Sequence, residues 1–151
     1  MAYTNGKISI PNVTGNLVIT VTVSKKAITN LANPSSAEWM TNHRIRSDGS
    51  ITTGNSQVTN LIPVAVGDVI RIRGGGSYAT MLQAAFPNAA STSGTPMTVQ
   101  QSYDSTTGVS TFSITATAYP YARWSIPNSQ IEEVNAITIT RNEEIPTNLS
   151  A

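Results

Sequence analysis

The chain lacks cysteine and has little charge, few aromatic side chains and no long apolar run. Because it contains Cys 0, disulfides and thiolate metal sites are excluded. Lys+Arg 9 against Asp+Glu 8 leaves a net charge of +1, without the basic clusters that nucleic-acid binding needs. No apolar stretch approaches the roughly 20 residues of a membrane span. We therefore expect neither a nucleic-acid partner nor membrane insertion.

Small polar residues are abundant instead. Ser, Thr and Asn make up about a third of the chain, far above ordinary usage, while only 11% is charged. This composition is typical of an exposed extracellular β-protein, yet the first residues, Met1 to Gly6, have neither the basic nor the apolar region of an export signal. A protein suited to the outside but not secreted suggests release by cell lysis. We therefore predict a phage virion component, extracellular after host lysis.

Apolar and polar residues alternate along most of the chain, as half-buried strands require. Strands are expected at residues 7–10, 17–24, 58–64, 69–73, 78–86, 97–103, 109–115, 121–126 and 136–141. The first two could form a hairpin, and Asp48-Gly49 predicts a hairpin turn between Ile45 and Ile51. Capping-box spacing at Ser35/Glu38 and Ser129/Glu132 predicts one or two single helical turns.

Many short strands separated by turn signals indicate an all-β protein, an antiparallel β-sandwich of the jelly-roll type. At 151 residues one domain is expected. We place that domain at residues 1–142. The polar residues 143–151 are predicted to form a C-terminal arm or linker.

Catalytic groups are sparse. His43 is the single histidine, and its neighbours supply no nucleophile motif, so a loop or strand-edge histidine is the favoured interpretation. The adjacent pairs Glu132-Glu133 and Glu143-Glu144 should diverge rather than converge as an acid/base pair. Asp48, Asp68 and Asp104 fall in turns, where Asp serves the backbone. We expect no enzyme activity, no metal and no cofactor.

The triple glycine Gly74-Gly75-Gly76 has no phosphate-loop context. It predicts a bulge or a close approach of backbones, and the alternative is that bare backbone admits a ligand or a neighbouring subunit.

Exposed aromatic rings beside planar hydrogen-bonding groups are the best binding candidates, because sugars stack on rings and bond to such groups. Trp124 alternates with Tyr121 and Arg123, so we expect Trp124 in the core and the other two outside. The tentative glycan-binding residues are the rings of Trp39, Tyr78 and Tyr121 and the guanidinium groups of Arg71, Arg73 and Arg123. The alternative is that these side chains cover apolar surface or pair with acids.

Several segments resemble a known family. They are residues 7–20, residues 30–34 through Trp39, Ile62-Pro63-Val64 with residues 66–71, and Phe112-Ser113-Ile114 leading to residues 121–125. Together they are similar to jelly-roll or galactose-binding-like β-sandwich modules in tail and baseplate-associated proteins of phages and prophages of Gram-positive hosts. The resemblance implies host-surface binding or a place in virion architecture, and it carries no catalytic residue. In that family the modules usually lie at the end of long fibre or tail polypeptides, whereas this sequence holds a single module and begins with Met1. We therefore expect either an excised domain or a small virion protein, such as a head decoration or head-fibre subunit.

We therefore expect a non-enzymatic virion surface protein, a decoration, fibre or tail-associated module. It would dock to other virion subunits and could bind cell-surface or mucosal glycans. We expect a homo-oligomer, for which a trimer would fit. The alternative is a carbohydrate-binding module from a bacterial surface enzyme or adhesin. A hydrolase would need an acid/base pair that the sequence does not show.

Overall fold

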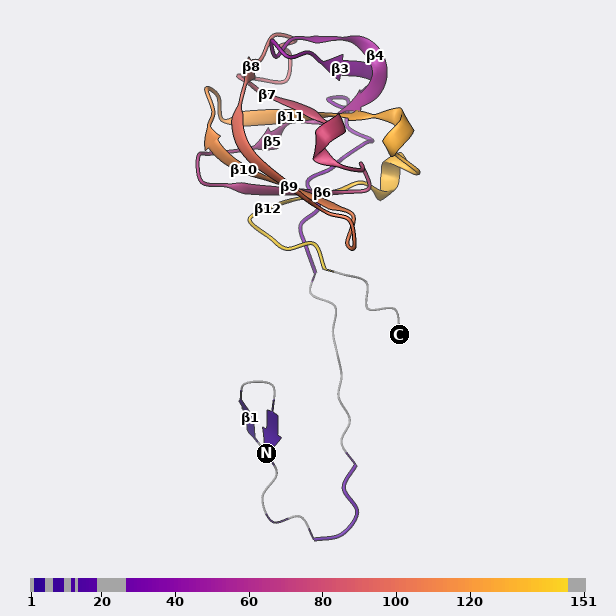
Figure 1. Ribbon diagram of the computed structural model, residues 1–151, viewed down its shortest axis with the longest axis vertical. Helices are drawn as coiled ribbons and strands as arrows, with labels where there is room; N and C mark the ends of the chain where they lie inside the picture. Colours follow the sequence, from indigo (N-terminus) through magenta and orange to yellow (C-terminus); the bar gives the residue numbers. More distant parts are fainter. Residues whose placement is uncertain (1, 5–6, 10–11, 13, 19–26, 147–151) are drawn as a thin grey trace.

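Two antiparallel sheets pack face to face in the computed structural model, which describes residues 2–4, 7–9, 12, 14–18 and 27–146 (Figure 1). The six-stranded sheet has the order β3 (Met40–Ile45), β4 (Ile51–Val58), β11 (Tyr121–Pro127), β7 (Leu82–Phe86) and β8 (Thr95–Pro96), and β5 (Ile62–Pro63) also pairs with β11. The four-stranded sheet has the order β12 (Thr138–Arg141), β6 (Val69–Arg73), β10 (Val109–Ala116) and β9 (Thr98–Asp104). The predicted all-β sandwich is confirmed.

Among the described residues the helical content is limited to single 3-10 turns, of which there are three rather than the one or two expected. They are η1 (Tyr78–Thr80), η2 (Asn128–Gln130) and η3 (Val134–Ala136). The turn predicted around Ser35 and Glu38 is wrong, because residues 34–38 form turns without a helix. Glu38 is used elsewhere: its carboxylate Oε2 accepts a hydrogen bond from the Leu61 backbone N–H at 3.1 Å. Among the described residues, no helix is long and apolar enough to cross a membrane.

The main core lies between the sheets and follows the predicted alternation. Ile70 and Ile72 of β6 point inward, and so do Phe112 of β10 and Trp124 of β11. The rings of Phe112 and Trp124 meet edge to face, with centroids 5.7 Å apart. Such a pair adds about 0.5–1.5 kcal/mol beyond its burial.

A second, smaller core covers the outer face of the six-stranded sheet. The β3–β4 hairpin curls over that face, so that Ile45 and Val58 pack on Ala84 and Phe86 of β7. Ile51 N–H donates to the Thr92 carbonyl at 2.8 Å, which ties the hairpin to the β7–β8 loop. The Asp-Gly turn predicted between Ile45 and Ile51 is confirmed, with Gly49 at φ 88°. Because the main core covers one face of β11 and the β3–β4 hairpin covers the other, β11 is buried on both of its faces.

Two predicted strands differ from the structure. Residues 58–64 do not form one strand, because residues 59–61 leave the ladder between β4 and β5. Residues 78–86 divide into the 3-10 turn η1 and the strand β7, so the predicted strand is confirmed only from Leu82 onward. These differences come from tertiary contacts, which strand periodicity does not report.

The leading segment contributes little to the sandwich among the described residues. β1 (Ala2–Thr4) and β2 (Lys7–Ser9) pair with each other, and Figure 1 draws them apart from the sandwich. β2 therefore pairs with β1 rather than with the strand predicted at 17–24. Leu17 and Val18 are exposed outside any strand, and residues 19–24 lie outside the described residues.

Candidate functional site

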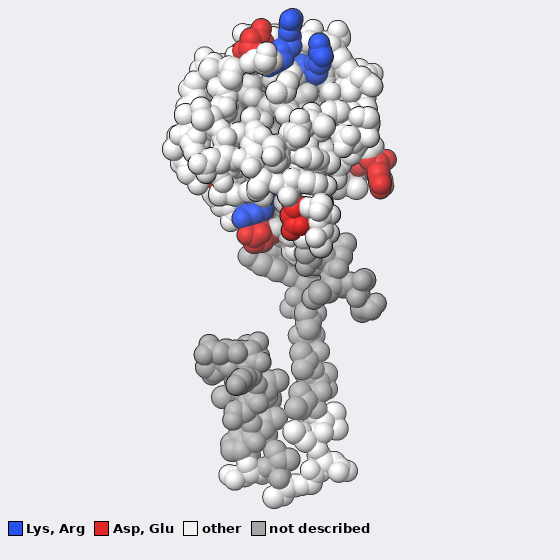
Figure 2. Space-filling model, in the orientation of Figure 1, with Lys and Arg blue, Asp and Glu red and all other residues white. Residues whose placement is uncertain are grey.

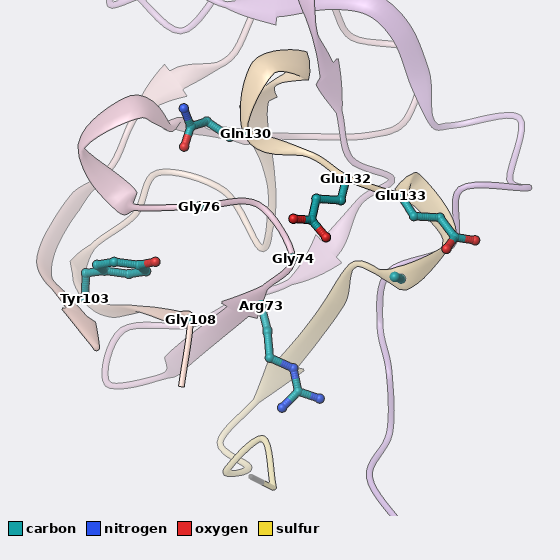
Figure 3. Close-up of a pocket in the computed structure, with 9 residues that line it drawn as sticks. Arg73, Gly74, Gly76, Tyr103, Gly108, Gln130, Glu132 and Glu133 are labelled. Carbon is teal, nitrogen blue, oxygen red and sulfur yellow. The ribbon is translucent and has the colours of Figure 1, made fainter. Parts of the chain in front are cut away.

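A pocket of about 430 Å³ lies at one end of the four-stranded sheet (Figure 3). Its volume falls in the range of small-molecule sites. Its lining comes from the end of β6 and the loop that follows, from the β9–β10 hairpin, and from η2, η3 and their connection. The lining residues are Arg73, Gly74, Gly76, Tyr103, Gly108, Gln130, Glu132, Glu133 and Ala136.

The glycines have a structural origin. Gly74 has φ 90° and Gly76 has φ 72°, a region that L side chains rarely adopt. A Cβ on Gly74 would lie 3.2 Å from the Ala136 carbonyl oxygen, and one on Gly76 would lie 2.4 Å from Gln130 Oε1. The triple glycine therefore marks the predicted close approach, here to the η2–η3 segment. The same bare backbone forms part of the pocket wall.

Polar and aromatic groups face this wall. Figure 3 shows the Tyr103 hydroxyl and the Glu132 carboxylate pointing toward the middle of the pocket, whereas Glu133 points away. The predicted divergence of the two glutamates is thus borne out. Tyr103 is 39% exposed, which leaves its ring open to a ligand. The pocket offers an aromatic surface, a phenol, a carboxylate and the Gln130 amide at once.

The structure places Arg71 and Arg73 together on the outer face of β6, as predicted. Both are already engaged by residues 143–146, which we call the C-terminal segment. Arg71 Nη1 donates to the Glu143 carbonyl at 3.1 Å, and Arg73 Nη1 donates to the Pro146 carbonyl at 2.8 Å. Arg71 also pairs with the Glu144 carboxylate at 2.7 Å. Arg73 also lines the pocket, so one side chain joins the pocket wall to the C-terminal segment.

Two of the predicted site residues are buried, which corrects their assignment as exposed ligand-binding groups. Trp39 is 8% exposed, and its indole N–H donates to Gln57 Oε1 at 2.9 Å. Arg123 is 0% exposed, although it lies on the outer side of β11, because the β3–β4 hairpin covers that side. Trp124 is in the core, as predicted.

The other two aromatic candidates lie apart from the pocket lining. Tyr78 belongs to η1 and packs against the main core. Tyr121 is 37% exposed at the start of β11, opposite Phe86 and Pro63 in the six-stranded sheet. The six predicted residues therefore do not converge, and Arg73 alone lines the pocket of Figure 3.

The remaining polar pocket residues were not in the predicted site. Tyr103 borders the Asp104 turn, which had indicated only a strand end. Glu132 carried a capping-box signal with Ser129, which reports local structure and does not show that β6 and β9 lie on the two sides of β10. Their convergence depends on long-range pairing, since Tyr103 faces Ser110 of β10, and Ser110 faces Ile72 of β6.

Two titratable side chains outside the pocket, His43 and Asp104, have structural partners. His43 lies on edge strand β3, as predicted, with Nδ1 2.8 Å from the Thr41 carbonyl. The Asp104 carboxylate accepts the Thr106 N–H at 2.9 Å, and such backbone bonds lower the pKa of Asp104. Within the described ranges, no three His, Cys, Asp or Glu side chains gather as metal ligands.

No family model, curated protein or solved structure matches this chain.

Proposed function

We propose that the chain is a non-enzymatic phage virion surface protein, a decoration, fibre or tail-associated module that docks to other virion subunits and binds host glycans. The observation that carries glycan binding is the pocket beside Tyr103. An accessible ring, a carboxylate, an amide and a guanidinium border it, with glycine backbone between them. Sugars offer apolar C–H faces to rings and hydroxyls to planar polar groups, so this combination suits them.

The character of the surface supports the virion setting. Figure 2 shows a face that is almost entirely uncharged, with a few separate charged spots. Weak glycan contacts become useful on a particle, because many copies raise avidity without new chemistry. The side chains that build the two cores, among the described residues, begin at Leu31.

Glycan binding is tested by NMR titration of the intact chain with a panel of neutral and acidic oligosaccharides. We expect shifts centred on Tyr103, Gln130 and Glu132, and Tyr103→Ala should weaken binding at least about tenfold, or about 1.4 kcal/mol. Tyr121→Ala is the matched control, because Tyr121 is equally exposed but lies on the other sheet. The proposal fails if no oligosaccharide binds, or if only the control variant loses binding.

A carbohydrate-binding module of a bacterial surface enzyme or adhesin is the second candidate. A glycan-binding pocket would serve a virion protein and a carbohydrate-binding module equally well. The β1–β2 pair, which Figure 1 draws apart from the sandwich, also fits a module that is joined to a larger protein. Detection of the chain in purified, nuclease-treated phage particles from the source culture separates the two. A soluble monomer with glycan affinity, absent from particles, favours the module.

A further inference from the structure

Four strands stand at the ends of the main strand order in the two sheets, and an unprotected edge is a template for pairing with another chain. Strand β12 is covered by its own chain. Leu31 N–H donates to the Ile139 carbonyl at 2.8 Å, and the Asn30 side-chain oxygen accepts the Ile139 N–H at 2.9 Å. The Asn30 amide N–H also donates to the Ile137 carbonyl at 3.2 Å. This edge is therefore closed.

Two further edges carry features that oppose pairing. Strand β8 has only two residues and includes Pro96, which has no N–H to donate. Strand β3 is interrupted between Thr41 and His43, where Asn42 takes φ 57°, and Arg44 adds an exposed charge. A short strand with proline, and a bulged, charged strand, are both recognised protections of an edge.

Strand β9 is less protected, because the one irregularity of its pairing with β10 lies at its first residue, where Thr98 pairs with Ala116. It runs for seven residues, Thr98–Asp104, with no Lys, Arg or Pro, and it pairs on one side with β10. Every residue except Val99 is exposed. Its one charge, Asp104, lies at the end and bonds to the following turn. Among the described residues no segment pairs with the free side of β9, although η1 lies close to the strand.

We propose that β9 pairs antiparallel with β9 of a second copy, about a twofold axis at Gln101. This register uses the whole strand and sets Gln101 opposite its counterpart. Val99 then faces the second Tyr103, which gives an apolar pair on the inward side. Each Asp104 faces Thr98, so like charges do not meet across the seam. The same surface is used by both copies, so the contact closes as a dimer.

A single strand pair buries less surface than stable interfaces, which exceed about 1,200 Å². The dimer should therefore be weak in dilute solution and should become populated where copies are concentrated, as on a particle. The inference does not depend on glycan binding. Variants at Gln101 leave the pocket lining unchanged, so the two proposals can fail separately.

Sedimentation velocity of the full chain between about 10 µM and 1 mM tests the dimer. We expect a reversible monomer–dimer equilibrium in the unmodified protein. Gln101→Lys and Gln101→Glu should each be monomeric, because like charges then face each other across the axis. An equimolar mixture of the two variants should restore the dimer. Thr95→Lys, on the protected β8 edge, is the matched control and should dimerise like the parent.

The register is tested by single cysteines, since the chain has none of its own. Gln101→Cys should cross-link under mild oxidation, because directly opposed Cβ atoms lie about 4.5–5.5 Å apart and a disulfide needs only a small adjustment. Thr95→Cys should not cross-link. The proposal is overturned by a monomer at every concentration, by a trimer, or by charge variants that associate as well as the parent.

Discussion

The guanidinium of Arg123 is held by backbone carbonyl oxygens from three separate segments. Arg123 Nη1 donates to the carbonyls of Thr59, at 2.8 Å, and of Glu38, and Nη2 donates to that of Ala89 at 3.3 Å. The cation also lies 5.9 Å from the centre of the Phe86 ring. Burial lowers the pKa of Arg123, and the charge of Glu38 acts in the opposite direction. Arginine nevertheless stays protonated in proteins, so this is a buried cation.

Replacement of Arg123 by methionine should destabilise the protein by roughly 2–5 kcal/mol, because it leaves buried carbonyls without donors. Urea unfolding followed by tryptophan fluorescence measures the loss. Arg46→Met, at an exposed position, should change stability by less than about 0.5 kcal/mol. Equal stability of the two variants would show that Arg123 does not organise the three segments.

Asp68 links the start of β6 to the end of β12. Its carboxylate accepts hydrogen bonds from Arg141 Nε at 2.7 Å, Ala65 N–H at 2.8 Å and Asn142 Nδ2 at 2.9 Å. Burial is the largest single influence and raises the pKa of Asp68, but these bonds together outweigh it. The net pKa lies below its ordinary value of 3.8.

Because the folded pKa of Asp68 is depressed, its contribution to stability is complete above pH 3.8 and is lost as the pH falls through the lower folded value. Asp68→Asn should cost about 1–3 kcal/mol at pH 7 and less at pH 2–3. Thermal unfolding across this pH range measures the difference. Glu133→Gln, an exposed position, should leave the profile unchanged. A constant penalty for Asp68→Asn would contradict the linkage.

At the scale of elements, the C-terminal segment packs on the outer face of the four-stranded sheet. Thr140 Oγ1 donates to the Glu143 carbonyl at 2.7 Å, and Ile145 is only 6% exposed. Arg71 and Arg73 hold the carbonyls on either side of Ile145. The first four residues of the predicted arm therefore contribute to the stability of the sandwich.

A chain that ends at Asn142 should lose about 2–4 kcal/mol, since it loses the Ile145 side chain and leaves Arg71 and Arg73 without these acceptors. A chain that ends at Pro146 keeps all of these contacts and is the control. Differential scanning calorimetry should show a lower melting temperature for the shorter chain alone. Equal melting temperatures would mean that the segment adds no stability.

Elements with simple alternation were predicted well from sequence, as β6 and β10 show, because one face of each meets the core and the other does not. Strand β11 does not follow this rule. Its outer residue Arg123 is covered by a hairpin that begins about 80 residues earlier in the chain. Likewise Tyr103 and Glu132 meet only after β9, β10 and β6 have paired. Alternation reports which residues share a face but not which distant segment will cover it.

At the scale of the whole molecule, the proposed binding pocket and the proposed dimer edge are contiguous. Tyr103 belongs to β9 and also lines the pocket. Pairing of two β9 strands would place two pockets on either side of one seam. A glycan chain that carries repeated epitopes could then contact both, which raises avidity without a tighter single site.

The two ends of the sandwich domain leave it next to each other. Leu31 pairs with β12, and Thr29 N–H donates to the Glu143 carboxylate at 3.1 Å. Force applied to the two ends of the domain would therefore act on these few hydrogen bonds first. Residues 29–31 would separate from β12 before the core is disturbed. The edge of β12 would then be exposed, so these few hydrogen bonds are what protects that edge from pairing with another chain.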